Sequence, residues 1–190
     1  CPVLLCLGRI QALKGLDVAI GALALSNSRE ARLVVVGGLS GDEGPKTYKD
    51  LKQRIKNNGL DDRVIFVEPQ THQALSTYYR AADVCLVPSR SESFGLVALE
   101  AAACGTAVVA SNVGGLRDNV TDGVTGILVN ERDPGRFAAA VDQLLDDPEM
   151  RSEMGRQGAL RASLNSWDLG AANAIEVFSR LTSKELVFCG

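Results

Sequence analysis

The sequence of 190 residues lacks most of the features that mark membrane, secreted or metal-binding proteins. It contains no run of about 18 apolar residues, and no signal peptide opens it, so we expect no transmembrane segment. Its cysteines form no C-x-x-C pair, so we expect buried free thiols in a reducing, cytoplasmic compartment. The lone His72 has no second ligand-type cluster beside it, so we expect neither a metal site nor a catalytic histidine. The cysteines are Cys1, Cys6, Cys85, Cys104 and Cys189.

Two familiar nucleotide-binding fingerprints are also missing. No G-x-G-x-x-G follows the first apolar run and no G-x-x-x-x-G-K-[ST] occurs, so a dinucleotide dehydrogenase or a P-loop ATPase fits poorly. The net charge of −3, from 20 basic and 23 acidic residues, comes without a long block of either sign, so we expect no nucleic acid partner. Any phosphate site must therefore lie in a local cluster of another kind.

Short apolar runs alternate with helical patterns along the whole chain. The runs are nearly continuous, as in strands that are covered on both faces. We predict such strands at Val3–Leu7, Leu33–Val36, Val64–Val67, Val84–Val87, Ala107–Ala110 and Ile127–Val129. We predict helices at Leu16–Leu25, Tyr48–Asn57, Gln73–Ala81, Leu96–Ala103, Pro134–Leu145, Glu149–Ser163 and Trp167–Leu181, and a surface loop at Ser40–Lys46.

This alternation predicts one α/β domain over residues 1–190, with a doubly wound parallel sheet of about six strands, similar to a Rossmann fold. The apolar share of 46% and the charged share of 23% suit a single globular core. In such a sheet, ligands bind at the carboxyl ends of the strands, near the point where the strand order reverses. Functional residues are therefore expected directly after the strands.

The segment after the first strand carries a glycine and two cations. Gly8 allows a sharp turn, and Arg9 and Lys14 bring positive charge to the edge where ligands bind. Arginine and lysine are the side chains that hold phosphate oxygens. Two solvated surface charges are the alternative interpretation of this segment.

A longer motif, residues 88–100, runs from the end of the fourth strand into a helix. The start of that helix offers unpaired N–H groups to a diphosphate, and Gly95 allows a close approach. Glu92 and Glu100 place two carboxylates at different depths of one cleft, as acceptors for sugar hydroxyls. Glu92 alternatively complements the helix dipole. Glu100 stands in an otherwise apolar helix, where an unpaired charge is costly, so a ligand is the favoured interpretation.

The pair Gly114-Gly115 follows the fifth strand and precedes a short helical stretch. The two glycines either present backbone N–H groups to a ligand or only make the turn, and the pattern leaves both open.

Taken together, these residues resemble the E-x7-E signature of the GT4 family of retaining glycosyltransferases. The resemblance covers nearly the whole chain, through residues 92–111, Gly8-Arg9 with Lys14-Gly15, residues 36–38, residues 80–83 and residues 114–116. The sequence looks most like the transferases that move N-acetylglucosamine from UDP to inositol phosphate. Sucrose-phosphate-synthase-like and mannosyl-transferring members are also similar. The sequence departs from the family at Ala107, where proline is usual, which affects strand rigidity and not chemistry.

The resemblance implies a two-domain enzyme of GT-B fold with its active site between the domains. This chain is similar to the C-terminal, donor-binding domain, and we expect preceding sequence to supply the acceptor-binding domain. Any peripheral membrane contact would belong to that other domain. The family needs no metal cofactor, and a nucleotide sugar, UDP-sugar in particular, is the expected donor.

The resemblance also assigns roles by position. Arg9 and Lys14 would neutralise the diphosphate, Glu92 would contact the transferred sugar, and Glu100 would bind the ribose. Gly8 would also bind the donor. Pro69 and Gln70 would lie near the base, and the backbone of Phe94, Gly95, Leu96 and Val97 would line the phosphate and the sugar. A UDP-sugar 2-epimerase of the same fold is the rival, although one histidine leaves few acid and base groups for it. A non-catalytic nucleotide-binding module is the rival from another class.

Overall fold

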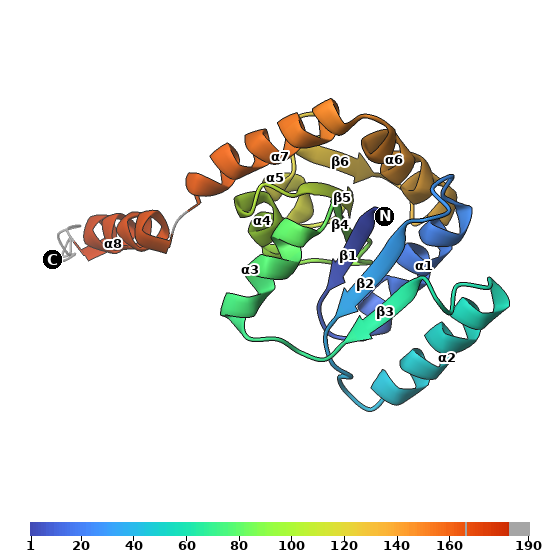
Figure 1. Ribbon diagram of the computed structural model, residues 1–190. Helices are drawn as coiled ribbons and strands as arrows, with labels where there is room; N and C mark the ends of the chain where they lie inside the picture. Colours follow the sequence, from blue (N-terminus) through green and yellow to red (C-terminus); the bar gives the residue numbers. More distant parts are fainter. Residues whose placement is uncertain (166, 183–190) are drawn as a thin grey trace, which may run out of the picture.

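Six parallel strands form one sheet at the centre of the molecule (Figure 1). The computed structural model describes residues 1–165 and 167–182. The strand order is β3-β2-β1-β4-β5-β6, the order of a doubly wound sheet built from two halves. The strands are β1 (Val3–Leu7), β2 (Arg32–Val36), β3 (Val64–Val67), β4 (Val84–Val87), β5 (Ala107–Ser111) and β6 (Gly126–Val129). The predicted fold class is confirmed, and the predicted strand ends differ by one residue at most.

Helices cover both faces of the sheet, which is why the strands are apolar throughout. The helices are α1 (Leu16–Leu25), α2 (Gly44–Asn57), α3 (His72–Ala81), α4 (Leu96–Ala103), α5 (Leu116–Asn119), α6 (Pro134–Asp146), α7 (Pro148–Ser163) and α8 (Trp167–Thr182), with a 3-10 turn, η1, at Ala12–Lys14. Residues of α1, α2 and α6 pack in one core cluster, and residues of α3, α4 and α5 pack in the other. All seven predicted helices are present, as the bounds above show.

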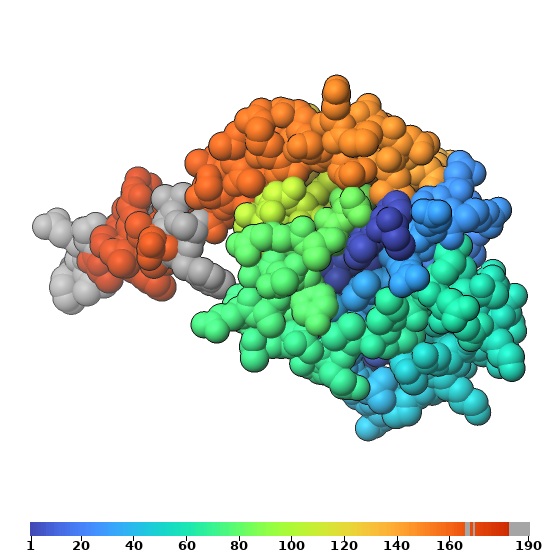
Figure 2. Space-filling model, in the orientation of Figure 1, coloured from blue at the N-terminus to red at the C-terminus, as the bar shows by residue number. Residues whose placement is uncertain are grey.

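The last helix, α8, stands apart from the rest of the molecule (Figures 1 and 2). Its side chains Ile175, Val177, Phe178 and Leu181 are exposed. Among the described residues, no helix combines the length and the apolar composition that crossing a membrane requires.

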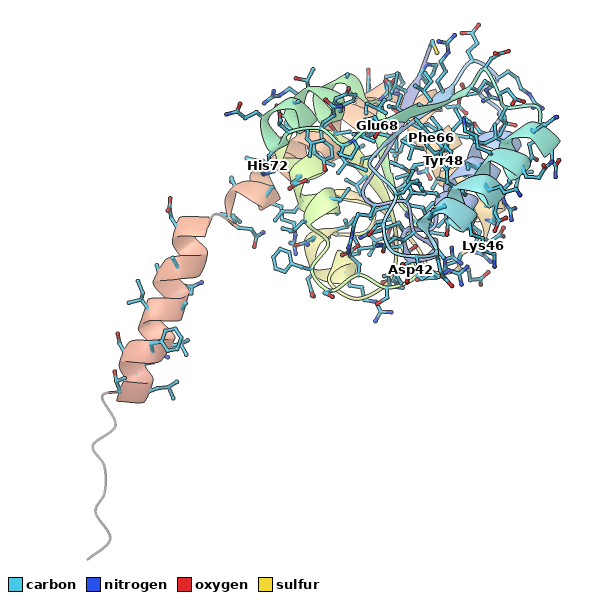
Figure 3. All side chains as sticks on the ribbon, turned by 90° about the horizontal axis from the view of Figure 1, so that it is seen from below. Asp42, Lys46, Tyr48, Phe66, Glu68 and His72 are labelled. Carbon is cyan, nitrogen blue, oxygen red and sulfur yellow. The ribbon has the colours of Figure 1, made fainter. Side chains whose placement is uncertain are left out.

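The predicted loop at Ser40–Lys46 is wrong in its second half, because α2 begins at Gly44. Pro45 stands in the first turn, where a missing N–H costs nothing. The helix continues because Leu51 and Ile55, four residues apart, both enter the core. In the same helix, the ring of Tyr48 packs edge to face against the ring of Phe66 on β3, with 5.0 Å between the ring centroids (Figure 3).

The prediction of buried cysteines is confirmed for Cys6 and Cys85. Both are free thiols, and burial raises the pKa of Cys85 to about 12. The prediction is wrong for Cys1, which is exposed, and for Cys104, which is only partly covered. Cys189 lies outside the described residues.

Candidate functional site

The strand order reverses between β1 and β4, which are neighbours in the middle of the sheet. The chain adds strands toward β3 on one side and toward β6 on the other, so the loops after β1 and β4 diverge. Parallel sheets open a crevice at this point, at the carboxyl ends of the strands. The two segments singled out from the sequence, residues 8–15 and 88–100, begin directly after these two strands.

Glycines let these two loops touch. Gly15 has a left-handed backbone with φ of 70°, and a Cβ there would lie 1.9 Å from the carbonyl oxygen of Pro88. The backbone N–H of Arg90 donates to the carbonyl of Leu13 at 2.9 Å, which ties the loops a second time. No residue with a side chain fits this approach without moving a loop, so the position of Lys14 depends on Gly15.

Lys14 and Glu92 meet across these loops. The Lys14 Nζ lies 2.7 Å from Glu92 Oε2, and both side chains are mostly covered, with 23% and 18% exposed. The hydroxyl of Ser89 donates to the same oxygen at 3.4 Å. The expected cation and the expected sugar-binding carboxylate therefore form an ion pair with one another. Ser89 is a site residue that the sequence analysis did not select.

Arg9 differs from Lys14 because no ion pair holds it among the described residues. Its side chain is exposed, and it lines a hollow of about 320 Å³ together with Gly8, Pro69 and Gln70. The structure therefore brings four of the predicted residues around one hollow. The guanidinium of Arg9 is available for an anion there.

The amino end of α4 opens at the same edge. Gly95 caps the helix with φ of 83°, and no side chain accepts a hydrogen bond from the first turn in the described part of the chain. Phe94 and Leu96, on either side of the cap, are exposed, and Val97 faces the small space that Arg9 and Lys14 also line. The N–H of Ala98 already donates to the carbonyl of Gly95 at 3.0 Å, so Leu96 and Val97 supply the N–H groups of this turn that can donate to a ligand.

The contacts of Gly114 and Gly115 favour the packing role over the ligand-binding role, the two alternatives that the sequence left open. A Cβ on Gly114 would lie 1.9 Å from the carbonyl oxygen of Glu92, and one on Gly115 would lie 2.5 Å from that of Phe94. The N–H of Gly115 donates to the carbonyl of Glu92 at 3.0 Å. The two glycines therefore support the loop that carries Glu92, and the N–H of Gly115 is already used.

Glu100 has a partner in the fold, so the cost of an unpaired charge no longer argues for a ligand there. The hydroxyl of Tyr79 donates to Glu100 Oε2 at 2.7 Å, so a protein group already satisfies part of the carboxylate. Glu100 also lines a hollow of about 600 Å³, whose other walls include His72, Phe94 and Leu96. The Nε2 atom of His72 lies 3.9 Å from Glu100 Oε1. His72 stands at the start of α3, toward the side where α8 leaves (Figure 3).

Two further observations limit the site. Asp83, part of a motif quoted above, accepts from the N–H of Val3 at 2.8 Å and pairs with Arg151 at 3.2 Å, so its contacts serve the fold. Within residues 1–165 and 167–182, no group of three or more histidine, cysteine, aspartate or glutamate side chains could hold a metal ion.

Comparison with known proteins identifies the family. The family model described as "Glycosyl transferases group 1" matches residues 2–161, and the chain belongs to this family. D-inositol 3-phosphate glycosyltransferase of Xylanimonas cellulosilytica is 43% identical over 183 residues, which are 96% of this chain and 43% of that protein. The chain thus spans less than half the length of this relative.

Solved structures share the fold. Sucrose-phosphate synthase from Thermosynechococcus elongatus superposes with a TM-score of 0.89 at 36% identity, over 96% of this chain and 46% of that one. Alr3699/HepE of Anabaena, in complex with UDP-glucose, superposes with a TM-score of 0.84 at 27% identity, over 95% of this chain and 48% of that one.

Proposed function

We propose that this chain is the donor-binding half of a retaining glycosyltransferase, and that it binds a UDP-sugar at the carboxyl ends of β1 and β4. The observation that carries the proposal is the meeting of Arg9, Lys14 and the uncapped amino end of α4 around one edge of the sheet. The binding of UDP-glucose by a relative of the same fold supports this choice of donor.

The charges suggest how the donor lies. The diphosphate contacts Arg9, Lys14 and the free N–H groups of α4, because these are the positive groups of the crevice. The ribose lies against Glu100 in the larger hollow, and the base lies toward Pro69 and Gln70. Glu92 then faces the transferred sugar, as the family resemblance implies.

This arrangement stabilises the leaving group. As the bond between sugar and diphosphate breaks, negative charge grows on the phosphate oxygens, and fixed positive groups lower the energy of that state most. Arg9, Lys14 and α4 supply this charge from the protein itself, so we expect transfer to need no metal ion. The acceptor attacks from the face that the diphosphate leaves, so Glu92 binds the sugar and does not act as a nucleophile.

The acceptor site belongs to a second domain that this chain does not contain. The lengths of the relatives support this division. Each is about twice as long as this chain, so its unmatched part is long enough for another domain of similar size. Closure of the two domains would bring the acceptor to the donor and exclude water. The chain by itself is therefore expected to bind donor and to transfer nothing.

Isothermal titration calorimetry with UDP, GDP and ADP tests the proposal on the 190-residue chain. We expect UDP to bind most tightly, and Arg9→Ala to weaken it by about tenfold, the loss for one charge-assisted hydrogen bond. Arg136→Ala, which removes an exposed arginine paired with Glu131 outside the hollows described above, is the matched control and should leave the affinity unchanged. Binding of no nucleotide would exclude a donor site, a preference for GDP would exclude UDP, and sugar transfer by this chain alone would exclude the division into halves.

A further inference from the structure

Tyr79 is a buried tyrosine whose hydroxyl reaches the edge of the ligand crevice. It lies in α3, its side chain is 2% exposed, and it packs among the residues of the core cluster between α3, α4 and the sheet. Burial, followed by the neighbouring Cys85 and the hydrogen bond to Glu100, raises the pKa of Tyr79 well above its usual range. The hydroxyl therefore keeps its proton around neutral pH and remains a donor there.

The hydroxyl has one acceptor, Glu100 Oε2, at 2.7 Å. Its ring cannot turn away, because the surrounding core holds it. A glutamate side chain has three rotatable bonds and normally samples several rotamers at a half-open position. One short hydrogen bond from a fixed donor restricts this freedom and determines which carboxylate oxygen faces the core.

Glu100 lines the hollow of about 600 Å³, and among the described residues no hydrogen bond reaches its other oxygen, Oε1. The Nε2 atom of His72 lies 3.9 Å from Oε1, and the side chain of His72 is mostly exposed. A ribose offers two neighbouring hydroxyls as donors, and a carboxylate can only accept. A carboxylate held in one orientation before the ligand arrives loses less entropy on binding than a mobile one.

We propose that Tyr79 is a positioning residue that holds Glu100 ready for the ribose hydroxyls and thereby determines the preference for ribonucleotides over deoxygenated ones. This inference rests on the proposed function, because it takes Glu100 as the ribose-binding group. Tyr79 itself does not touch the nucleotide. It acts through the orientation of Glu100. Removing its hydroxyl therefore weakens the binding of only those ligands whose ribose hydroxyls contact Glu100.

The test compares UDP with 2′,3′-dideoxy-UDP on the chain and on two variants, by calorimetry. Tyr79→Phe removes the hydroxyl and keeps the ring. Tyr78→Phe is the matched control: it makes the same change one residue away, and in the described part of the chain no hydrogen bond involves the Tyr78 hydroxyl. Thermal unfolding of each variant is measured alongside, so that a loss of stability is seen separately.

We expect Tyr79→Phe to bind UDP about fivefold more weakly and to bind 2′,3′-dideoxy-UDP within about twofold of the parent, so that the preference for UDP shrinks. Tyr78→Phe should change neither affinity. In the Glu100→Gln background, Tyr79→Phe should cause no further loss for UDP, because the two residues act as one unit.

Other outcomes overturn the inference in distinguishable ways. An equal loss for both ligands would give Tyr79 a structural role only, and no loss for either would remove its role entirely. If the parent binds UDP and 2′,3′-dideoxy-UDP equally well, Glu100 does not read the ribose, and this inference fails while the donor site stands. If the parent binds no nucleotide, the proposed function itself fails.

Discussion

At the scale of single residues, the main feature of the proposed site is that its lysine is paired with its own glutamate. Lys14 and Glu92 form a short, mostly covered ion pair. A diphosphate that binds the ammonium of Lys14 must therefore displace the carboxylate of Glu92 or lie beside it. A partly buried carboxylate next to phosphate oxygens repels them, because water screens such charges poorly there. The charge of Glu92 therefore opposes the binding of UDP alone.

Glu92→Gln is accordingly expected to raise the affinity for UDP by roughly threefold to tenfold, since it frees the ammonium of Lys14 and removes the repulsion. Calorimetry with UDP measures this, and Glu153→Gln, which changes an exposed glutamate on α7, serves as control. In the proposed two-domain enzyme the same change should reduce transfer, because we propose that Glu92 also faces the sugar. A lower affinity for UDP in Glu92→Gln would show that the ion pair helps to hold the diphosphate.

At the scale of elements, glycines determine how the loops meet. Gly15 and Gly114 both have left-handed backbones, and a Cβ at either would lie 1.9 Å from a backbone oxygen of the loop between β4 and α4. These contacts connect the segments after β1, β4 and β5. The loop that carries Glu92 is thus held from two sides before any ligand binds, as an anion site requires.

Two alanine substitutions separate backbone strain from close approach. Gly123 has φ of 72°, nearly that of Gly15, but nothing lies within 4 Å of its missing Cβ. Gly123→Ala should therefore cost about 1–2 kcal/mol, the cost of the left-handed conformation alone. Gly15→Ala should cost at least about 2 kcal/mol more, because the loop must also move away from Pro88.

Urea unfolding followed by circular dichroism gives both free energies of unfolding. Gly15→Ala should also weaken UDP binding, because Lys14 moves with the loop, whereas Gly123→Ala should leave the affinity unchanged. Equal costs for the two substitutions would mean that the contact between Gly15 and Pro88 contributes nothing to stability.

At the scale of the whole molecule, coverage of both sheet faces protects the central thiols. Cys6 on β1 and Cys85 on β4 are buried, and burial raises the pKa of both, to about 12 for Cys85. The thiolate, which is the form that reacts, is therefore scarce at about pH 8 for both side chains. Cys1 is exposed and free of this protection.

Iodoacetamide at about pH 8 should therefore label Cys1 in the native protein and spare Cys6 and Cys85, as peptide mass spectrometry would show. Unfolding in concentrated urea should make all three react. Rapid labelling of Cys85 without urea would mean that the sheet opens much more often than a packed core allows.

The sequence by itself determined the order of the elements and the doubly wound sheet, and it predicted the edge at which we propose the ligand site. Each of these follows from local patterns: apolar runs for strands, periodic stretches for helices, and glycines or cations at the strand ends. Arg9 and Glu92 were selected in this way, because they follow β1 and β4, and their role in binding stays a prediction. The start of α2 was misplaced because a polar first turn looks like a loop.

Only the tertiary structure decided which of these residues pair. Lys14 and Glu92 are 78 residues apart, and Tyr79 and Glu100 are 21 apart on different helices. It also decided that Gly114 and Gly115 support a neighbouring loop. Such contacts depend on how close loops and helices come once the core has packed. A local sequence pattern does not determine that distance. Glu100 therefore looked unpaired in the sequence, although a tyrosine on the adjacent helix holds it in the fold.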